Sequence, residues 1–260
     1  MTEALIALPF GLAIGLIVGG VGGGGAILAL PVLVYVLGEG VGPASTASLI
    51  VVAVAAAVGA GALAFRGHVC WRLALTFSAP AAVGSLLGAI ASTAVSPPVL
   101  ILAFVPVMLV AAAGTWRRGD EADPDEKGDC PALSWPRILV AGFGVGMLTG
   151  FFGVGGGFLI VPVLTLWLAT SFRRAVATSL VILTLTGVAA LASHLATGSG
   201  LNVPVTIAMA SSTGIGALAG TMVGRRLPQQ HLAHAFAVVV TAIALFLLVD
   251  TLLFGGPPAG

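Results

Sequence analysis

Long apolar segments separated by short loops run along almost the whole chain, and several are long enough to cross a bilayer as a helix. The only strongly polar stretch, Arg117–Arg137, divides these segments into two sets of five. The pattern predicts an all-α polytopic membrane protein, with apolar segments at about 4–20, 26–37, 44–65, 73–95 and 98–115, and then at 138–152, 157–169, 175–196, 203–224 and 232–254.

The composition agrees with this prediction. Of the 260 residues, 58% are hydrophobic and only 7% are charged, whereas soluble domains carry roughly 25% charged residues. The formal net charge of +1 and the absence of an arginine-rich patch interleaved with aromatic residues indicate no nucleic-acid partner. The first residues lack the basic region of a cleavable signal peptide, so we expect the first apolar segment to belong to the mature, multi-pass protein.

The two sets of segments repeat one another. Gly22–Leu28 is followed by Pro31-Val32-Leu33, and Gly153–Leu159 is followed at the same distance by Pro162-Val163-Leu164. At this offset of 131 many residues of the first half meet identical residues in the second, including Gly11, Gly15, Gly19, Gly22, Gly24, Gly25, Leu28, Leu37, Ala44, Ser48 and Leu49. With one residue inserted, Gly88 also matches Gly220. The chain is an internal duplication, and we predict a first membrane repeat at 1–116, a polar cytoplasmic linker at 117–137 and a second repeat at 138–260.

Basic residues occupy different loops in the two halves. The loop that holds Arg173 and Arg174 has no base at its equivalent in the first half, Gly38–Pro43, and the loop of Arg66 and Arg72 has none in the second. Lys and Arg near membrane helices favour the cytoplasmic side. If all bases are cytoplasmic, the halves are inverted repeats and both termini lie outside. The tryptophans also lie near the basic loops, as expected for an aromatic belt at the membrane–water interface: Trp71, Trp116, Trp135 and Trp167.

This arrangement requires the first two segments of each half to form a hairpin that enters and leaves on one side. Twelve residues, 26–37, cover only about 18 Å of a core of about 30 Å, so a partly re-entrant hairpin of short helices broken at the glycines fits. Each repeat is then a glycine-broken hairpin plus three transmembrane helices. The alternative is a single kinked helix over 4–37, which would make the repeats parallel.

The glycine clusters are the candidate substrate site. Consecutive glycines break helices, at about 1 kcal/mol each relative to alanine, and a helix that restarts beyond the break offers free N–H groups that suit an anion. A close-packed turn without a ligand is the alternative. The candidate residues are Gly22, Gly23, Gly24 and Gly25 in the first half and Gly153, Gly155, Gly156 and Gly157 in the second, joined by the small hydroxyl residues Ser48, Thr178 and Ser179. By contrast, the regular glycine spacings Gly11-Gly15-Gly19, Gly142-Gly146-Gly150 and Gly216-Gly220 predict helix-packing faces.

Other polar residues are few. No Asp or Glu lies in the middle of an apolar segment, which disfavours metal transport and carboxylate-based proton coupling. His194 is either an interfacial residue or a titrating gate. Neither Cys70 nor Cys130 belongs to a CxxC motif or a His/Cys cluster, so the sequence predicts neither a disulfide nor a metal site. No catalytic constellation and no cofactor motif appears, so we expect a protein that is not an enzyme.

The duplicated glycine break with Pro-Val-Leu, the run Ala177-Thr178-Ser179 after Arg173-Arg174, and the chain length resemble the sulfite exporter TauE/SafE family of bacterial membrane permeases. The first half departs from the pattern, with Gly23 where the second has Val154 and with no counterpart of Arg173-Arg174. The resemblance implies a secondary transporter, most simply an exporter, of a small sulfur-containing anion such as sulfite, sulfoacetate or another organosulfonate across the bacterial cytoplasmic (inner) membrane. The alternatives are import of a similar anion with a co-ion, or a small membrane enzyme or accessory subunit. The sequence leaves homo-oligomer formation open.

Overall fold

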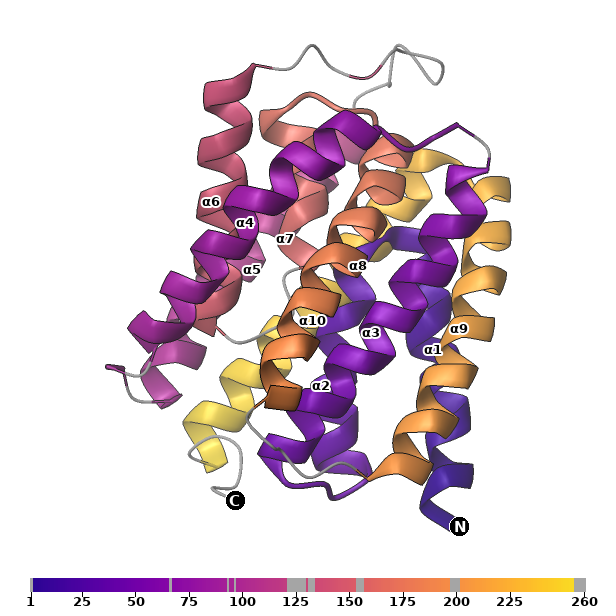
Figure 1. Ribbon diagram of the computed structural model, residues 1–260, viewed down its shortest axis with the longest axis vertical. Helices are drawn as coiled ribbons and strands as arrows, with labels where there is room; N and C mark the ends of the chain where they lie inside the picture. Colours follow the sequence, from indigo (N-terminus) through magenta and orange to yellow (C-terminus); the bar gives the residue numbers. More distant parts are fainter. Residues whose placement is uncertain are drawn as a thin grey trace.

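The computed structural model describes residues 2–65, 67–92, 94–95, 97–120, 130, 134–152, 157–196 and 202–254. All regular elements in these ranges are helical (Figure 1). The first half contains α1 (Thr2–Val21), the 3-10 helix η1 (Gly23–Leu28), α2 (Ala29–Pro31), the π-helical turn η2 (Val32–Val36), α3 (Val41–Ala64), α4 (Trp71–Ser92) and α5 (Pro97–Asp120). The second contains α6 (Trp135–Phe152), α7 (Gly157–Pro162), the π-helical turn η3 (Val163–Trp167), α8 (Phe172–Ala196), α9 (Val203–Arg226) and α10 (Gln229–Phe254).

The helices have the lengths that a bilayer requires. Among the described residues, six helices are long and apolar enough to cross a membrane, and shorter apolar helices cover Leu5–Val21, Gly25–Val36, Leu102–Arg117 and Gly157–Trp167. Large apolar side chains such as Val110 and Leu252 are exposed on the outside of the bundle, where lipid would cover them. The all-helical membrane fold predicted from the apolar segments is therefore confirmed, and the predicted segment ends agree with the helix ends to within a few residues.

The chain reverses direction after α1. Gly22 makes this turn with φ +84° and ψ −154°, a backbone conformation that essentially only glycine adopts. Gly25 then lies against α1, since a Cβ at this position would be 2.8 Å from the backbone nitrogen of Val18. The structure therefore contains a hairpin of α1 with η1, α2 and η2, and the alternative of one kinked helix over 4–37 was wrong.

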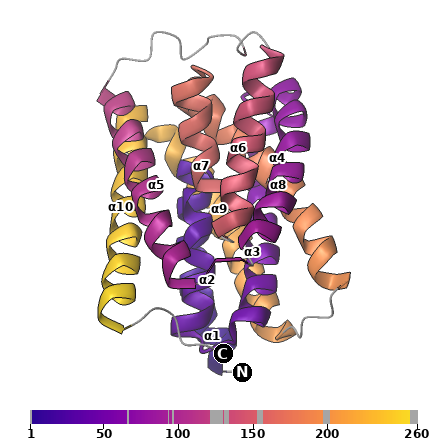
Figure 2. The same cartoon turned by 90° about the vertical axis from the view of Figure 1, so that its left-hand side faces the viewer.

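Helices of one half pair with helices of the other. The most extensive contacts join α1 to α9 and α4 to α6, and further contacts join α5 to α10, α3 to α8 and η1 to α7. Figures 1 and 2 show that α1 begins and α10 ends at one end of the bundle, whereas α5 ends and α6 begins at the other. α1 and α6, which are equivalent in the duplication, therefore run in opposite directions.

Glycines allow the two closest helix pairs to approach. A Cβ on Gly15 of α1 would lie 2.8 Å from the backbone nitrogen of Ala217 in α9, and one on Gly146 of α6 would lie 2.7 Å from the Cα of Ala81 in α4. Real Cβ atoms essentially never come so close to backbone atoms, so these crossings require glycine. The packing faces predicted from the regular glycine spacings are confirmed: Gly11, Gly15 and Gly19 contact α9, Gly142, Gly146 and Gly150 contact α4, and Gly216 and Gly220 contact α1.

The helix ends that carry Arg72, Arg137, Arg174 and Arg225 gather at the end of the bundle where α5 ends and α6 begins, which we call the basic end. Arg173 donates from its guanidinium to the carbonyl oxygen of Leu227 at 3.3 Å, which ties the start of α8 to the chain just beyond α9. The four tryptophans, all exposed, lie at or near helix ends on this side. At the opposite end the Tyr35 hydroxyl donates to the Asp250 carboxylate at 2.9 Å and links η2 to α10.

A disulfide at the basic end corrects the sequence analysis. Cys70, directly before α4, is bonded to Cys130 of the linker, although the sequence predicted no disulfide. Motif spacing missed the pair because the two cysteines lie 60 residues apart in the sequence and only the tertiary structure brings them together. The Arg174 guanidinium lies against both sulfurs, with Nη1 3.5 Å from Sγ of Cys130 and 4.0 Å from Sγ of Cys70.

Candidate functional site

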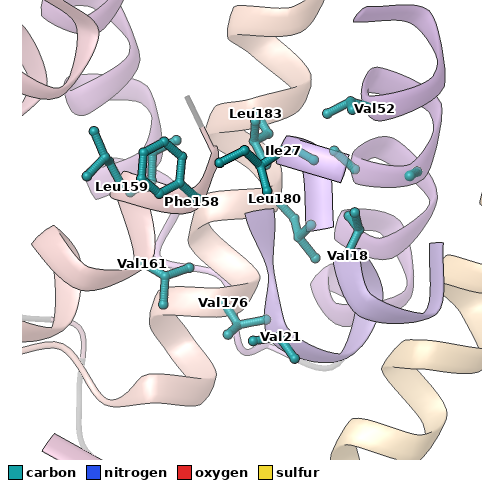
Figure 3. Packing of buried hydrophobic residues seen from close by; sticks show 14 of the residues in the cluster. Val18, Val21, Ile27, Val52, Phe158, Leu159, Val161, Val176, Leu180 and Leu183 are labelled. Atoms are coloured by element: carbon teal, nitrogen blue, oxygen red, sulfur yellow. The ribbon is translucent and has the colours of Figure 1, made fainter. Parts of the chain in front are cut away.

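The two glycine breaks meet inside the protein. A Cβ on Gly157, at the start of α7, would lie 2.8 Å from the Cα of Gly23 in η1, so the two backbones touch with no side chain between them. Figure 3 shows buried apolar side chains of these elements, among them Ile27 of η1, Phe158 of α7 and Leu183 of α8. The first hairpin and the start of α7 therefore meet at one point.

Not every candidate residue can be placed. Gly153, Gly155 and Gly156 lie outside the described residues, and so does the side chain of His194, whose backbone belongs to the last part of α8. Gly22 forms the turn after α1, and Gly23, Gly24 and Gly25 lie in η1.

Thr178 and Ser179 are completely buried in α8 behind the break. The Thr178 hydroxyl oxygen accepts a hydrogen bond from the backbone N–H of Cys70 at 3.2 Å. Ser179 donates its hydroxyl to the carbonyl oxygen of Val176 at 2.8 Å, and its Oγ would lie 3.0 Å from a Cβ on Gly22. In this conformation Ser179 packs against the turn at Gly22, and Thr178 links α8 to the segment before α4.

Ser48 has a different environment from its repeat equivalent Ser179. It is half-buried, donates to the carbonyl oxygen of Ser45 at 2.8 Å, and lines a cavity of about 370 Å³. Neither Thr178 nor Ser179 lines this cavity. The structure therefore separates the three hydroxyl residues that the sequence analysis combined into one site.

The cavity extends from the breaks toward the end of the bundle opposite the basic end. Ala26 of η1, Ile160 of α7 and Leu183 of α8 line its inner part, and Leu183 also contacts Gly157. Ser45 near the start of α3 and Ala89 near the end of α4 line the part farthest from the basic end. A cavity of this volume lies within the usual range for small-molecule sites, about 300–1,000 Å³.

The lining is apolar except for hydroxyl groups. Among the lining residues that the structure describes none is charged, and their side-chain polar groups are the hydroxyls of Ser45, Ser48, Ser85, Thr149 and Thr186. Within the described ranges His, Cys, Asp and Glu form no group of three that could hold a metal ion. These described lining residues offer hydrogen bonds and apolar contact to a small solute.

Ser85, Thr149 and Thr186 were not among the site residues predicted from the sequence. That prediction was limited to hydroxyl residues that closely follow a glycine break, and these three lie elsewhere in the apolar segments. A comparison that looked for differences between the halves within the apolar segments would have found them.

Comparisons with known proteins agree with this architecture. The sequence model of the family described as "Sulfite exporter TauE/SafE" matches residues 7–247. Two proteins of Xylella fastidiosa, both named "Probable membrane transporter protein", are 30% and 32% identical to the chain. Each alignment covers 94% of this chain and 94% of the relative. A protein of Methanocaldococcus jannaschii with a similar name is 25% identical over 95% of this chain and 97% of its own. No solved structure matches.

The match covers the glycine breaks, the helices that line the cavity and both repeats, and the relatives match over nearly their whole length. The chain belongs to the sulfite exporter TauE/SafE family of membrane transporters.

Proposed function

We propose that the protein is a secondary carrier that exports a small sulfur-containing anion, such as sulfite, sulfoacetate or another organosulfonate, across the bacterial cytoplasmic membrane. The family description supports transport of such an anion, and the names of the relatives support membrane transport. The structural observation that carries the proposal is the hydroxyl-lined cavity that ends at the two glycine breaks.

The proposed site lies at the inner end of this cavity. Ser48 lines the cavity, and Ala26, which follows Gly25, lines it beside the break. Backbone N–H groups at Gly22–Gly25 and at Gly153, Gly155, Gly156 and Gly157 are the other donors in the proposal. Thr178 and Ser179 are buried in this conformation, and we propose that they reach the substrate when the two halves rearrange, since carriers of this kind alternate by moving one repeat against the other.

The electrostatics favour release over tight binding. Because the described lining residues carry no charged side chain, a bound anion would be held there by hydrogen bonds and could leave readily. An inside-negative potential drives an anion outward by about 2.3 kcal/mol per charge per 100 mV, so export needs no coupling ion. Import of the same anion would need a co-ion to supply this energy.

We further propose that the halves are inverted repeats and that the basic end faces the cytoplasm. The opposite directions of α1 and α6 and the pairing of α1 with α9 and of α4 with α6 support the first statement. The gathering of arginine-bearing helix ends on one side supports the second. The linker 117–137 is then cytoplasmic, and the cavity extends toward the outside. Disulfides are rare in the cytoplasm, so in this orientation Cys70 and Cys130 are reduced in growing cells and bonded only after oxidation.

Flux in liposomes tests the function. Purified protein in vesicles loaded with radiolabelled sulfite or sulfoacetate should release the label faster when the vesicle interior is negative. Gly156→Leu should abolish the flux because a side chain would enter the break, whereas His194→Ala should retain it. An absence of flux for every sulfur anion tried would contradict the proposal, and flux only against the potential with a co-ion would establish import.

A further inference from the structure

The cavity hydroxyls come from separate helices that converge on one space. Ser85 belongs to α4, Thr149 to α6 and Thr186 to α8, and all three are half-buried on the cavity lining. None of the three belongs to the glycine breaks, so they form a group distinct from the site inferred from the duplicated motif.

The duplication shows that the fold does not require these hydroxyls. At the offset of 131, Thr149 corresponds to Val18 and Thr186 to Ala55, and with the one-residue insertion Ser85 corresponds to Ala217. Val18, Ala55 and Ala217 are completely buried in the core. At each pair of equivalent positions, the residue that is packed in the core is therefore apolar, and the residue that borders the cavity carries a hydroxyl.

Local hydrogen bonding leaves the hydroxyls able to bind a solute. Thr149 donates to the carbonyl oxygen of Gly146 at 2.8 Å and Thr186 to that of Ile182 at 2.9 Å, both within their own helices. Helix carbonyls already accept a backbone N–H, so these side-chain bonds are dispensable. A hydroxyl that rotates from such a carbonyl to an anion exchanges a neutral hydrogen bond for a charge-assisted one, which is stronger.

We propose that Ser85, Thr149 and Thr186 hydrogen-bond the anionic head of the substrate and determine which anion the cavity accepts. This inference rests on the proposed function, because it assigns specificity to the cavity of that same carrier. A substrate held in this way makes most of its polar contacts with α4, α6 and α8, since the equivalent positions on α9, α1 and α3 offer no hydroxyl.

The test compares isosteric variants in the liposome assay. Thr149→Val and Thr186→Val remove one hydroxyl with almost no change of shape, and Ser85→Ala removes the third. Loss of one hydrogen bond to a charged group should raise the KM for sulfite or sulfoacetate about 10- to 150-fold, with little change in the maximal rate. Thr149→Ser and Thr186→Ser keep the hydroxyl, so the KM should stay within about twofold of that of the unaltered protein. This change is much smaller than the one expected from the loss of a hydrogen bond.

Matched controls lie on the same helices away from the cavity. Thr184 on α8 donates to the carbonyl oxygen of Leu180 at 2.8 Å and Ser78 on α4 to that of Ala74 at 2.7 Å, and neither lines the cavity. Thr184→Val and Ser78→Ala should leave the KM unchanged. If the unaltered protein transports the anion and the three cavity variants have the same KM as the unaltered protein, the inference is overturned while the proposed function stands. If the unaltered protein transports no sulfur anion, both are overturned.

Discussion

Gly23 and Gly157 bring the backbones of the two halves into direct contact, with no side chain between the helix breaks at the centre of the bundle. A Cβ on either glycine would overlap the backbone of the other, and on Gly157 it would also meet Leu183 Cδ1 at 2.6 Å. Because Leu183 also lines the cavity, this contact fixes the cavity's inner end. The relationship explains why glycine occurs at both positions even though they are not equivalent in the duplication.

The first prediction concerns this contact. Gly23→Ala should lower the free energy of unfolding by about 1–3 kcal/mol, the usual cost of overpacking, and should reduce flux because the hairpins must separate. Thermal unfolding in detergent and liposome flux measure the two effects. Gly61→Ala on α3 is the control, since a Cβ there would meet nothing within 4 Å. Equal stability of Gly23→Ala and the unaltered protein would show that the breaks do not touch.

A second prediction separates two glycines of α6. Gly146→Ala places a methyl group against the backbone of Ala81 and should destabilise the α4–α6 pair by about 1–3 kcal/mol. Gly144→Ala, whose Cβ would meet nothing within 4 Å, should be neutral or stabilise by about 0.4–1 kcal/mol through reduced backbone entropy of the unfolded chain. The melting temperature of Gly146→Ala should therefore fall, whereas that of Gly144→Ala should stay the same or rise. A shift of both in the same direction would contradict the close crossing.

Thr178 provides a third prediction. Thr178→Val removes the acceptor of the buried Cys70 N–H, and leaving such a donor unpaired should cost about 1–3 kcal/mol of stability. Thr178→Ser keeps the acceptor and should recover most of the loss. Chemical unfolding of purified protein measures both. If Thr178→Val is as stable as the unaltered protein but transports poorly, the residue contacts substrate instead of supporting the fold.

The fourth prediction concerns the disulfide. In oxidised protein the Cys70–Cys130 bond closes a loop across 60 residues, so Cys130→Ser should lower stability by about 2–4 kcal/mol. Added reductant should remove the difference between the two proteins. Melting temperatures with and without dithiothreitol provide the measurement. If Cys130→Ser has the same melting temperature as the oxidised unaltered protein, the bond does not form.

The fifth prediction concerns orientation. A reporter fused behind α10 should be found outside the cytoplasm. Alkylation of intact cells with a membrane-permeant maleimide should label Cys70 and Cys130, whereas an impermeant reagent should label neither. Labelling by the impermeant reagent, or a cytoplasmic reporter, would place the basic end outside and would make the disulfide permanent.

Much of the fold could be predicted because the bilayer imposes simple rules on the chain. Helix positions follow from the length of apolar runs, and Gly15 and Gly146 could be assigned to packing faces because only small residues permit such close crossings. The duplication supplied each pattern twice, which identified Gly22–Gly25 and Gly157 as the places where helices break. These properties are local, so the sequence carries them directly.

The cavity and the disulfide could not be predicted in this way. Helices such as α3 and α8 are apolar on nearly all sides, so their periodicity does not tell which face meets which neighbour. Only the tertiary structure decided that Ser48 lines a cavity while Ser179 is buried behind Gly22, and that Cys70 meets Cys130. The sequence by itself determined where the helices lie and break. The tertiary structure decided which polar groups share a site, because this depends on the rotation and register of helices from opposite halves. Rotation and register depend in turn on the summed packing of many similar apolar side chains.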